Sequence, residues 1–267
     1  MNEFRLDPET MNFTLVSEAK LDCPACRKDI KPIAAADFKS DYIRVYEIKD
    51  GVQPSKFELS GELLKSSKAD GYNEIIVDSK EHGDPFSSYS AEDVENLLMF
   101  VSSRVKSMDK YSFGKNIEIS RYLRGHGFFD LVILDIPNYD RSKCIECAYV
   151  ANTGSREAYR TEHFVAYTPF APRTGLILSV SPLKHIQITD IDPVTAFDLA
   201  GLIKKVIDAL GDDVTMTIHQ PGNGHFSVRF YAGERNPFSL LGINRISLAP
   251  EELAKEIGEK LKNETEH

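Results

Sequence analysis

The chain has 267 residues, 42% of them hydrophobic, so it can bury a sizeable core as one large domain or two small ones. Its formal net charge of −9 argues against a nucleic-acid partner, because binding to a phosphate backbone needs a clustered excess of Lys and Arg. No apolar run approaches the roughly 20 residues of a membrane span, and residues 1–10 are too polar for a signal peptide. We therefore expect a cytoplasmic protein with no nucleic-acid or membrane partner.

The first half of the chain contains a strand-like run, a helix and a second strand region, in that order. Residues 49–69, which precede them, are polar and weakly periodic and are predicted to form a long loop or mobile insert. The apolar run 74–82 is typical of a strand and ends in His82. A helix should begin at Ser90, because Asp93 three residues later completes a capping pattern. The apolar stripe of this helix consists of Val94, Leu97, Leu98, Val101, Val105 and Met108, and the strand region after it carries His126.

The second half repeats this order of elements. The apolar run 176–185 ends in His185, as the first run ends in a histidine. Asp192 followed by Pro193 predicts the start of the next helix. The stripe of this helix consists of Leu199, Leu202, Ile203, Val206 and Leu210, and the strand region after it carries His219.

The repeated order predicts a duplicated fold. Each half, residues 1–140 and 141–267, is expected to be an α+β domain with an antiparallel sheet and a flanking helix, joined near residues 137–143. A third helix should cover residues 250–261, and the tail 263–267 should be frayed.

The four cysteines form two Cys-x-x-Cys pairs, which we interpret as metal ligands because cytoplasmic thiols stay reduced. Such a turn brings two thiolates to one point, and two later histidines can complete a zinc tetrahedron. Four protein ligands leave no open position for water, so two structural zinc ions are predicted and a zinc hydrolase is not. The alternative is that the cysteines are simply buried and the histidines are structural. The predicted ligands are Cys23, Cys26, His82 and His126 for one zinc, and Cys144, Cys147, His185 and His219 for the other.

Short motifs in both halves resemble one known family. In the first half these are Phe-Arg-Leu-Asp-Pro-Glu-Thr at 4–10, Cys-Pro-Ala-Cys at 23–26 and Gly-Tyr-Asn-Glu-Ile-Ile-Val at 71–77; in the second they are His-Phe-Val-Ala-Tyr-Thr-Pro-Phe-Ala at 163–171, Pro-Leu-Lys-His at 182–185 and Ile-His-Gln at 218–220. Their order is similar to that of the galactose-1-phosphate uridylyltransferase family, particularly the two-zinc branch that includes ADP-glucose phosphorylase. The resemblance implies tandem histidine-triad-like domains, zinc at the positions above, a nucleotide or sugar-phosphate ligand and a homodimer.

The same resemblance implies ping-pong nucleotidyl transfer, in which a histidine of a His-Pro-His-x-Gln segment attacks the α-phosphorus. The corresponding segment here is His-Gly-Phe-Phe-Asp at 126–130. If His126 is the metal ligand, Phe128 takes the nucleophile's place and Asp130 replaces the glutamine. Shifting the alignment by one residue puts Gly127 there instead. Neither residue can attack phosphorus, so we expect the usual histidine chemistry to be missing.

Residues that could replace the lost chemistry lie in Gly-Asn-Gly-His-Phe-Ser-Val-Arg at 222–229. On a strand His225, Ser227 and Arg229 would share one face, where His225 could act as nucleophile or general acid and the other two could bind a phosphate. The alternative is an exposed polar sheet face. Arg121 and Arg124 could also attract an anion, or could form a solvated positive edge.

Three functions follow from these patterns. The first is a divergent uridylyltransferase relative that binds a nucleotide or sugar phosphate without the histidine chemistry. The second is an active nucleotidyltransferase or phosphorylase that uses His225 as its catalyst. The third is a zinc-stabilised protein-interaction module.

Overall fold

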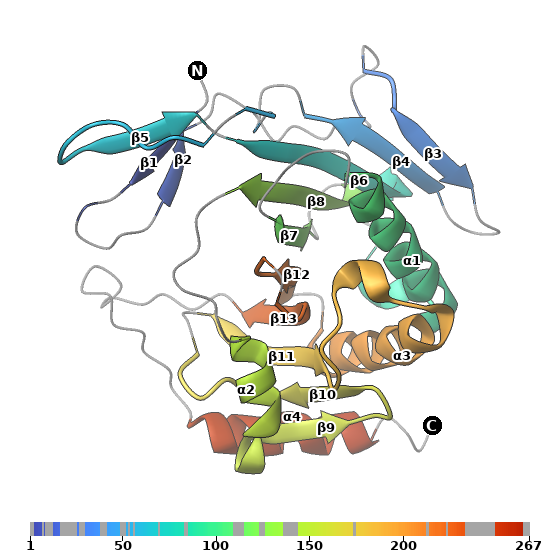
Figure 1. Cartoon of the computed structure of the whole chain (residues 1–267). Coiled ribbons are helices and arrows are strands. Elements are labelled where there is room, and N and C mark those ends of the chain that lie inside the picture. The colour runs from blue at the N-terminus through green and yellow to red at the C-terminus, as the bar shows by residue number, and fades with distance from the viewer. Residues whose placement is uncertain are drawn as a thin grey trace.

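The computed structural model contains one large sheet with two long helices packed on one face (Figure 1). The described residues are 3–6, 8, 13–16, 26, 30–37, 42–48, 52, 54–55, 57–68, 70–82, 85–108, 115–122, 126–135, 144–172, 175–211, 214–222, 224–232 and 249–263. Within these ranges, every helix is too short or too polar to cross a membrane.

The 10-stranded sheet is antiparallel, and both halves of the chain contribute to it. In spatial order its strands are β3 (Ala34–Asp37), β4 (Tyr42–Glu47), β6 (Gly71–His82), β8 (His126–Asp135), β7 (Lys115–Tyr122), β12 (Val214–Gln220), β13 (Ser227–Ala232), β11 (Leu176–Pro182), β10 (Phe164–Tyr167) and β9 (Glu157–Arg160). The two halves meet where β7 pairs with β12. On either side of this junction the connectivity is the same, because β6, β7 and β8 are arranged as β11, β12 and β13 are. The boundary at residue 140 stays a prediction, and residues 136–143 lie outside the described ranges.

A separate three-stranded sheet shows that the loop predicted for residues 49–69 was partly wrong. It consists of β2 (Phe13–Val16), β1 (Glu3–Leu6) and β5 (Lys65–Lys68), and β5 lies inside the predicted loop. The sequence of β5, Lys-Ser-Ser-Lys, has no apolar alternation to indicate a strand. The strand forms through backbone pairing with β1, and the buried hydroxyl of Ser67 accepts the backbone N–H of Glu58 at 2.8 Å.

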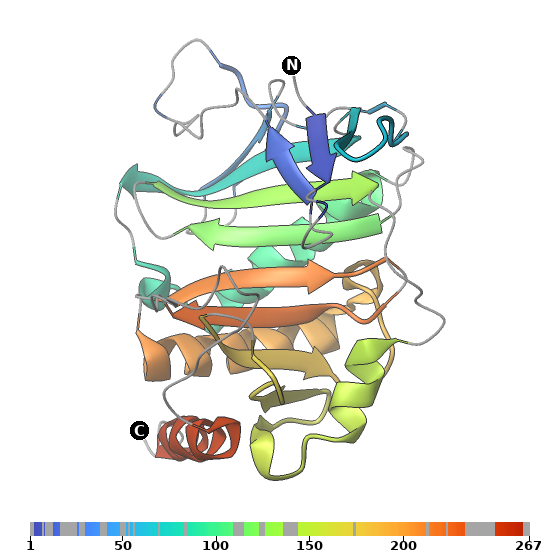
Figure 2. The same cartoon turned by 90° about the vertical axis from the view of Figure 1, so that its left-hand side faces the viewer.

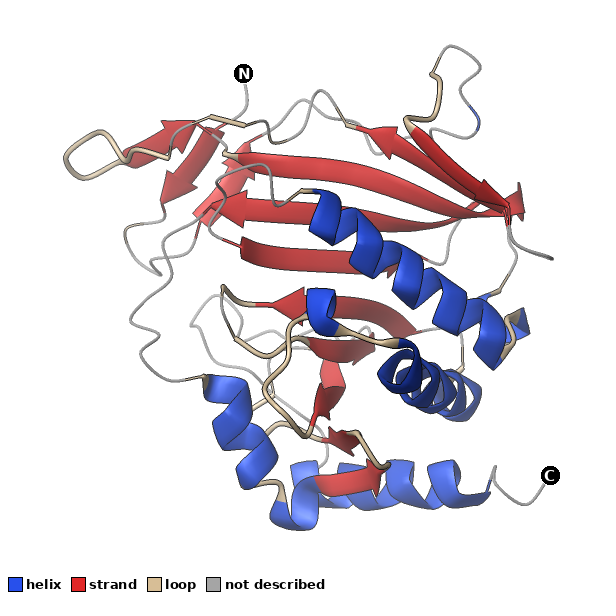
Figure 3. Ribbon diagram, turned by 45° about the vertical axis from the view of Figure 1, so that its right-hand side comes forward, coloured by secondary structure: helices blue, strands red, loops and turns tan. Residues whose placement is uncertain are grey.

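Two helices cover one face of the large sheet: α1 (Ala91–Ser107) and α3 (Pro193–Leu210). They lie side by side behind the strands in Figure 2 and in front of them in Figure 3. Their predicted apolar stripes are confirmed, because every member is buried except the partly buried Leu210. Each buried aliphatic side chain contributes roughly 1.5–3 kcal/mol of transfer free energy. The predicted third helix is α4 (Pro250–Asn263), which packs against β9, and the tail after it lies outside the described residues.

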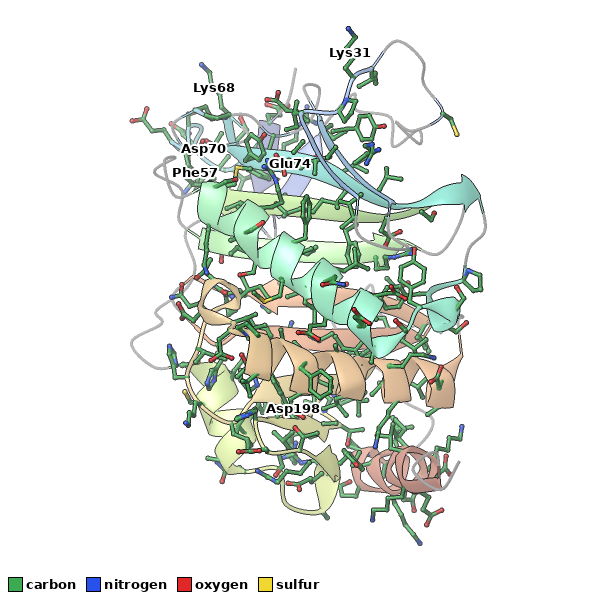
Figure 4. The ribbon with its side chains drawn as sticks, turned by 90° about the vertical axis from the view of Figure 1, so that its right-hand side faces the viewer. Lys31, Phe57, Lys68, Asp70, Glu74 and Asp198 are labelled. Atoms are coloured by element: carbon green, nitrogen blue, oxygen red, sulfur yellow. The ribbon has the colours of Figure 1, made fainter. Side chains whose placement is uncertain are left out.

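Carboxylates fix α1 to a strand and α3 to the connection between β9 and β10 (Figure 4). Glu74 of β6 is fully buried and accepts hydrogen bonds from Arg104 of α1, with 3.0 Å between Oε2 and Nε. Asp198 of α3 accepts the hydroxyl of Thr161 at 2.7 Å and the backbone N–H of His163 at 3.0 Å. These contacts orient α1 and α3 on the sheet. The two helices cover one face of the sheet, and the other face is not covered by them.

Both helix starts have the capping geometry that the sequence predicts. The Ser90 hydroxyl accepts the Asp93 N–H at 3.1 Å, and the Asp93 carboxylate accepts the Ser90 N–H at 2.8 Å. At α3 the Asp192 carboxylate accepts the Thr195 N–H at 2.8 Å, and Pro193 occupies the first helical position. Each cap satisfies backbone donors that have no partner inside the helix.

Replacing Ser90 with alanine is expected to lower the free energy of unfolding by about 1 kcal/mol, because the first turn of α1 loses its cap. Urea unfolding followed by circular dichroism measures this change. The matched control is Ser103→Ala on the exposed face of α1, where the hydroxyl bonds only the Phe100 carbonyl of its own helix. Equal effects of the two substitutions would contradict the capping role.

Candidate functional site

A cluster of sulfur and nitrogen donors lies at one end of the second half of the sheet. Cys144 is the N-cap residue of the short helix α2 (Ile145–Ala151), and Cys147 is in its first turn. His185 lies three residues after the end of β11, and His225 lies two residues before β13. The donor atoms of these residues all lie within 4.8 Å of one another, so the cluster could hold a metal ion.

The spacing of the donors fits zinc. The Cys147 Sγ lies 3.3 Å from the His185 Nδ1 and 3.6 Å from the His225 Nδ1, and the Cys144 Sγ lies 3.8 Å from the His225 Nδ1. A tetrahedral ion with usual zinc–sulfur and zinc–nitrogen bond lengths separates such donors by about 3.6 Å. The backbone N–H of His225 also points at the Cys144 Sγ, at 3.4 Å.

The electrostatics of the cluster favour a neutral imidazole. Burial lowers the pKa of His225; the Lys184 carbonyl opposes this change, while the neighbouring His185 adds to it. Burial raises the pKa of the Cys147 thiol, and the adjacent Cys144 raises it further. A metal ion binds neutral histidine and deprotonated cysteine, so binding here would release thiol protons.

The fourth member of the cluster is His225, where the sequence predicted His219. His219 lies on β12, paired with Ser227 of β13, and is not in the cluster. In the repeated connectivity β13 corresponds to β8. His225 lies just before β13 as His126 lies at the start of β8, so His225 is the counterpart of His126. A sequence signal was present, since both histidines follow a glycine (Gly125 and Gly224), but spacing alone does not distinguish His225 from His219.

The first predicted zinc site is described only in part. His82 and His126 are opposite each other in the pairing of β6 with β8. Cys26 is exposed, Cys23 lies outside the described residues, and so do the side chains of both histidines. This site stays a prediction.

The predicted substrate contacts on β13 belong to a buried polar network. Arg229 donates to the carboxylate of Glu146 at 2.8 Å and to the Ser227 hydroxyl at 3.2 Å. Ser227 is fully buried, so the alternative of an exposed polar face is wrong for this residue. Binding of a substrate by Ser227 and Arg229 stays a prediction, and Arg124 lies outside the described residues.

Arg121 was expected to attract an anion or to lie on a solvated edge, and the structure contradicts both expectations. The side chains of Arg121 and Asp78 are both 0% exposed, with 2.8 Å between the Arg121 Nε and the Asp78 Oδ2. Burial raises the pKa of the Asp78 carboxyl, and the Arg121 guanidinium opposes that rise. The arginine therefore neutralises an internal carboxylate.

The segment that resembles the catalytic motif lies on β8. His126, Phe128 and Asp130 alternate with the buried Phe129 and Leu131, whose side chains pack in the core under α1. Phe128 is paired with Val77 of β6 and with Tyr122, the last residue of β7.

Known proteins share this architecture, although no family model matches the sequence. The galactose-1-phosphate uridylyltransferase of Thermotoga maritima is 22% identical, over 97% of this chain and 98% of that protein. A solved uridylyltransferase mutant has a TM-score of 0.75 at 20% identity, covering 98% of this chain and 99% of its own. The chain is similar to the galactose-1-phosphate uridylyltransferases over nearly its whole length.

The resemblance to the uridylyltransferase family, predicted from the motifs, is therefore confirmed, and with it the α+β histidine-triad-like fold that the solved structures share. An ADP-glucose phosphorylase from Arabidopsis thaliana, solved with ADP-glucose bound, also has this fold. Its TM-score is 0.65 at 19% identity, over 97% of this chain and 99% of that chain.

Proposed function

We propose that this protein binds a nucleotide or sugar phosphate on a zinc-stabilised uridylyltransferase fold and lacks the family's histidine nucleophile. The observation that carries the proposal is Phe128, two residues after His126 on β8, at the position that the family resemblance gives to the nucleophile. A phenyl ring has no lone pair with which to attack phosphorus. The names of the relatives, a uridylyltransferase and a phosphorylase solved with ADP-glucose, support the ligand class.

Zinc is proposed at two sites, and the described cluster supports one of them. Cys144, Cys147, His185 and His225 would hold the ion, which would link α2 to the ends of β11 and β13. With four protein ligands the ion has no open position for substrate or water, so its role would be structural. The first site would use Cys23, Cys26, His82 and His126 in the same way.

The position of His225 disfavours the second predicted function, an active transferase in which His225 is the catalyst. Its Nδ1 faces both cysteine sulfurs, within 3.8 Å. A nitrogen that binds a metal ion cannot also attack phosphorus, and the other ring nitrogen, Nε2, is buried where a substrate cannot reach it. Family resemblance further suggests a homodimer, which light scattering on the purified protein tests. The cytoplasmic location expected from the sequence stays a prediction.

Incubation with UDP-glucose, UDP-galactose or ADP-glucose labelled with ³²P at the α-phosphate is expected to leave no radioactivity on the denatured protein. Equilibrium dialysis of the same compounds is expected to show saturable binding. The Thermotoga maritima relative is the positive control for labelling, because the family mechanism passes through a nucleotidyl-histidine. Label on any histidine would show that an active transferase remains, whereas neither label nor binding would favour the interaction module.

A further inference from the structure

A buried glutamate lies between the two cysteines of the cluster. Glu146 is the residue before Cys147 in the first turn of α2, and only 4% of its surface is exposed. Its neighbour Ile145, also between the cysteines, is 62% exposed. The helix therefore turns a carboxylate, and not its apolar residue, toward the sheet.

Side chains from three strands converge on this carboxylate. Tyr167 of β10 donates to its Oε2 at 2.8 Å, and Ser181 of β11 donates to the same oxygen at 3.2 Å. From β13, Arg229 donates to Oε1 at 2.8 Å and Ser227 lies 3.5 Å from it. Both oxygens thus receive donors, and one donor carries a full positive charge, which offsets the cost of burying the carboxylate.

The helix that carries the cysteines is too short to hold its own position. α2 has 7 residues, and isolated helices below roughly 12 residues are marginal in water. Besides the cluster and the Glu146 contacts, the described attachments of α2 to the sheet include the Tyr149 ring, whose centroid lies 6.3 Å from that of Tyr167. The position of the two sulfurs therefore depends on how this helix is anchored.

We propose that Glu146 is the positioning residue of the Cys144–Cys147–His185–His225 cluster, because it anchors α2 to β10, β11 and β13 and so sets both sulfurs against the histidines. This inference rests on the proposed zinc site. The Glu146 carboxylate is the anion that four donor side chains surround: Arg229, Tyr167, Ser181 and Ser227. Truncating it leaves those donors around a space that a small carboxylate ion fits.

Zinc affinity of the full-length protein, measured by competition with a chromophoric chelator, tests the proposal. Glu146→Ala is expected to weaken zinc binding at this cluster by about 10–100-fold, the usual effect of losing a group that orients metal ligands. Glu146→Gln, which keeps an oxygen acceptor but not the charge that Arg229 needs, should lie between the alanine variant and wild type. Ile145→Ala, one residue away and exposed, is the matched control and should stay within about twofold of wild type.

Chemical rescue separates anchoring from general damage to the fold. Sodium formate or acetate should recover much of the zinc affinity of Glu146→Ala, whereas sodium chloride at the same concentration should not. None of these salts should change the zinc affinity of the wild-type protein. Cys147→Ser, which removes a ligand, identifies the step of the titration that belongs to this cluster and should not be rescued. If Glu146→Ala does not fold, the zinc affinities of Glu146→Gln and Ile145→Ala are compared instead, and only Glu146→Gln should bind zinc more weakly than wild type.

Two failures are distinguishable. Wild-type zinc affinity in both Glu146 variants would overturn the positioning role and leave the zinc proposal standing. Wild-type protein that binds no zinc at the step removed by Cys147→Ser would overturn the proposed zinc site and this inference together.

Discussion

Removing zinc from the Cys144–Cys147–His185–His225 cluster is expected to lower the melting temperature of the protein by at least about 10 °C. Structural zinc contributes its binding free energy to folding. A loss of about 4–5 kcal/mol, well below the full value for a zinc-dependent peptide, already produces such a shift in a chain of this size. The cluster joins the short helix α2 to the residues just after β11 and just before β13.

Differential scanning calorimetry before and after chelation measures the shift, and atomic absorption confirms the loss of metal. Cys147→Ser should carry one zinc fewer than wild type and should melt lower before any chelator is added. Its further shift on chelation should then report the other predicted site alone. An unchanged melting temperature in wild-type protein whose zinc has been removed would refute a structural role for the metal.

Replacing Asp78 with alanine is expected to lower the free energy of unfolding by about 3–5 kcal/mol, because it leaves a buried guanidinium without its counter-charge. Arg121 is fully enclosed, with its guanidinium carbon 5.0 Å from the ring centroid of Phe86 and 5.6 Å from that of Phe129. The Tyr89 hydroxyl donates to the Asp78 carbonyl at 2.9 Å, and burial raises the pKa of this tyrosine, so it remains a donor.

Urea unfolding measures the loss, and a double substitution tests its cause. Asp78→Leu with Arg121→Met removes both charges and should be less destabilised than Asp78→Ala, since a buried pair can be replaced by apolar side chains at little cost. Glu157→Ala, which breaks the partly exposed pair with Arg160, is the control and should cost no more than about 1 kcal/mol. If Asp78→Ala also cost no more than about 1 kcal/mol, water would have to reach Arg121 in the variant.

Features that depend on neighbours along the chain were predictable from the sequence. Ser90 with Asp93, and Asp192 with Pro193, predicted the starts of α1 and α3, because a cap acts within one turn. The apolar stripes predicted the buried faces of both helices, since a helix repeats every 3.6 residues whatever it packs against. The polar strand β5 was missed because it has no such local pattern and forms only by pairing with β1.

By itself the sequence determined α1, α3 and α4, the resemblance to the uridylyltransferases and the cysteine pair of the described cluster, since these depend on motifs and spacings within short segments. Only the tertiary structure decided that His225 and not His219 joins the cluster, that Arg121 faces Asp78, and that Glu146 turns inward. The physical reason is distance along the chain: Asp78 and Arg121 are 43 residues apart and Glu146 and Arg229 are 83 apart. Strand pairing in the sheet brings such residues together, and no local pattern encodes it.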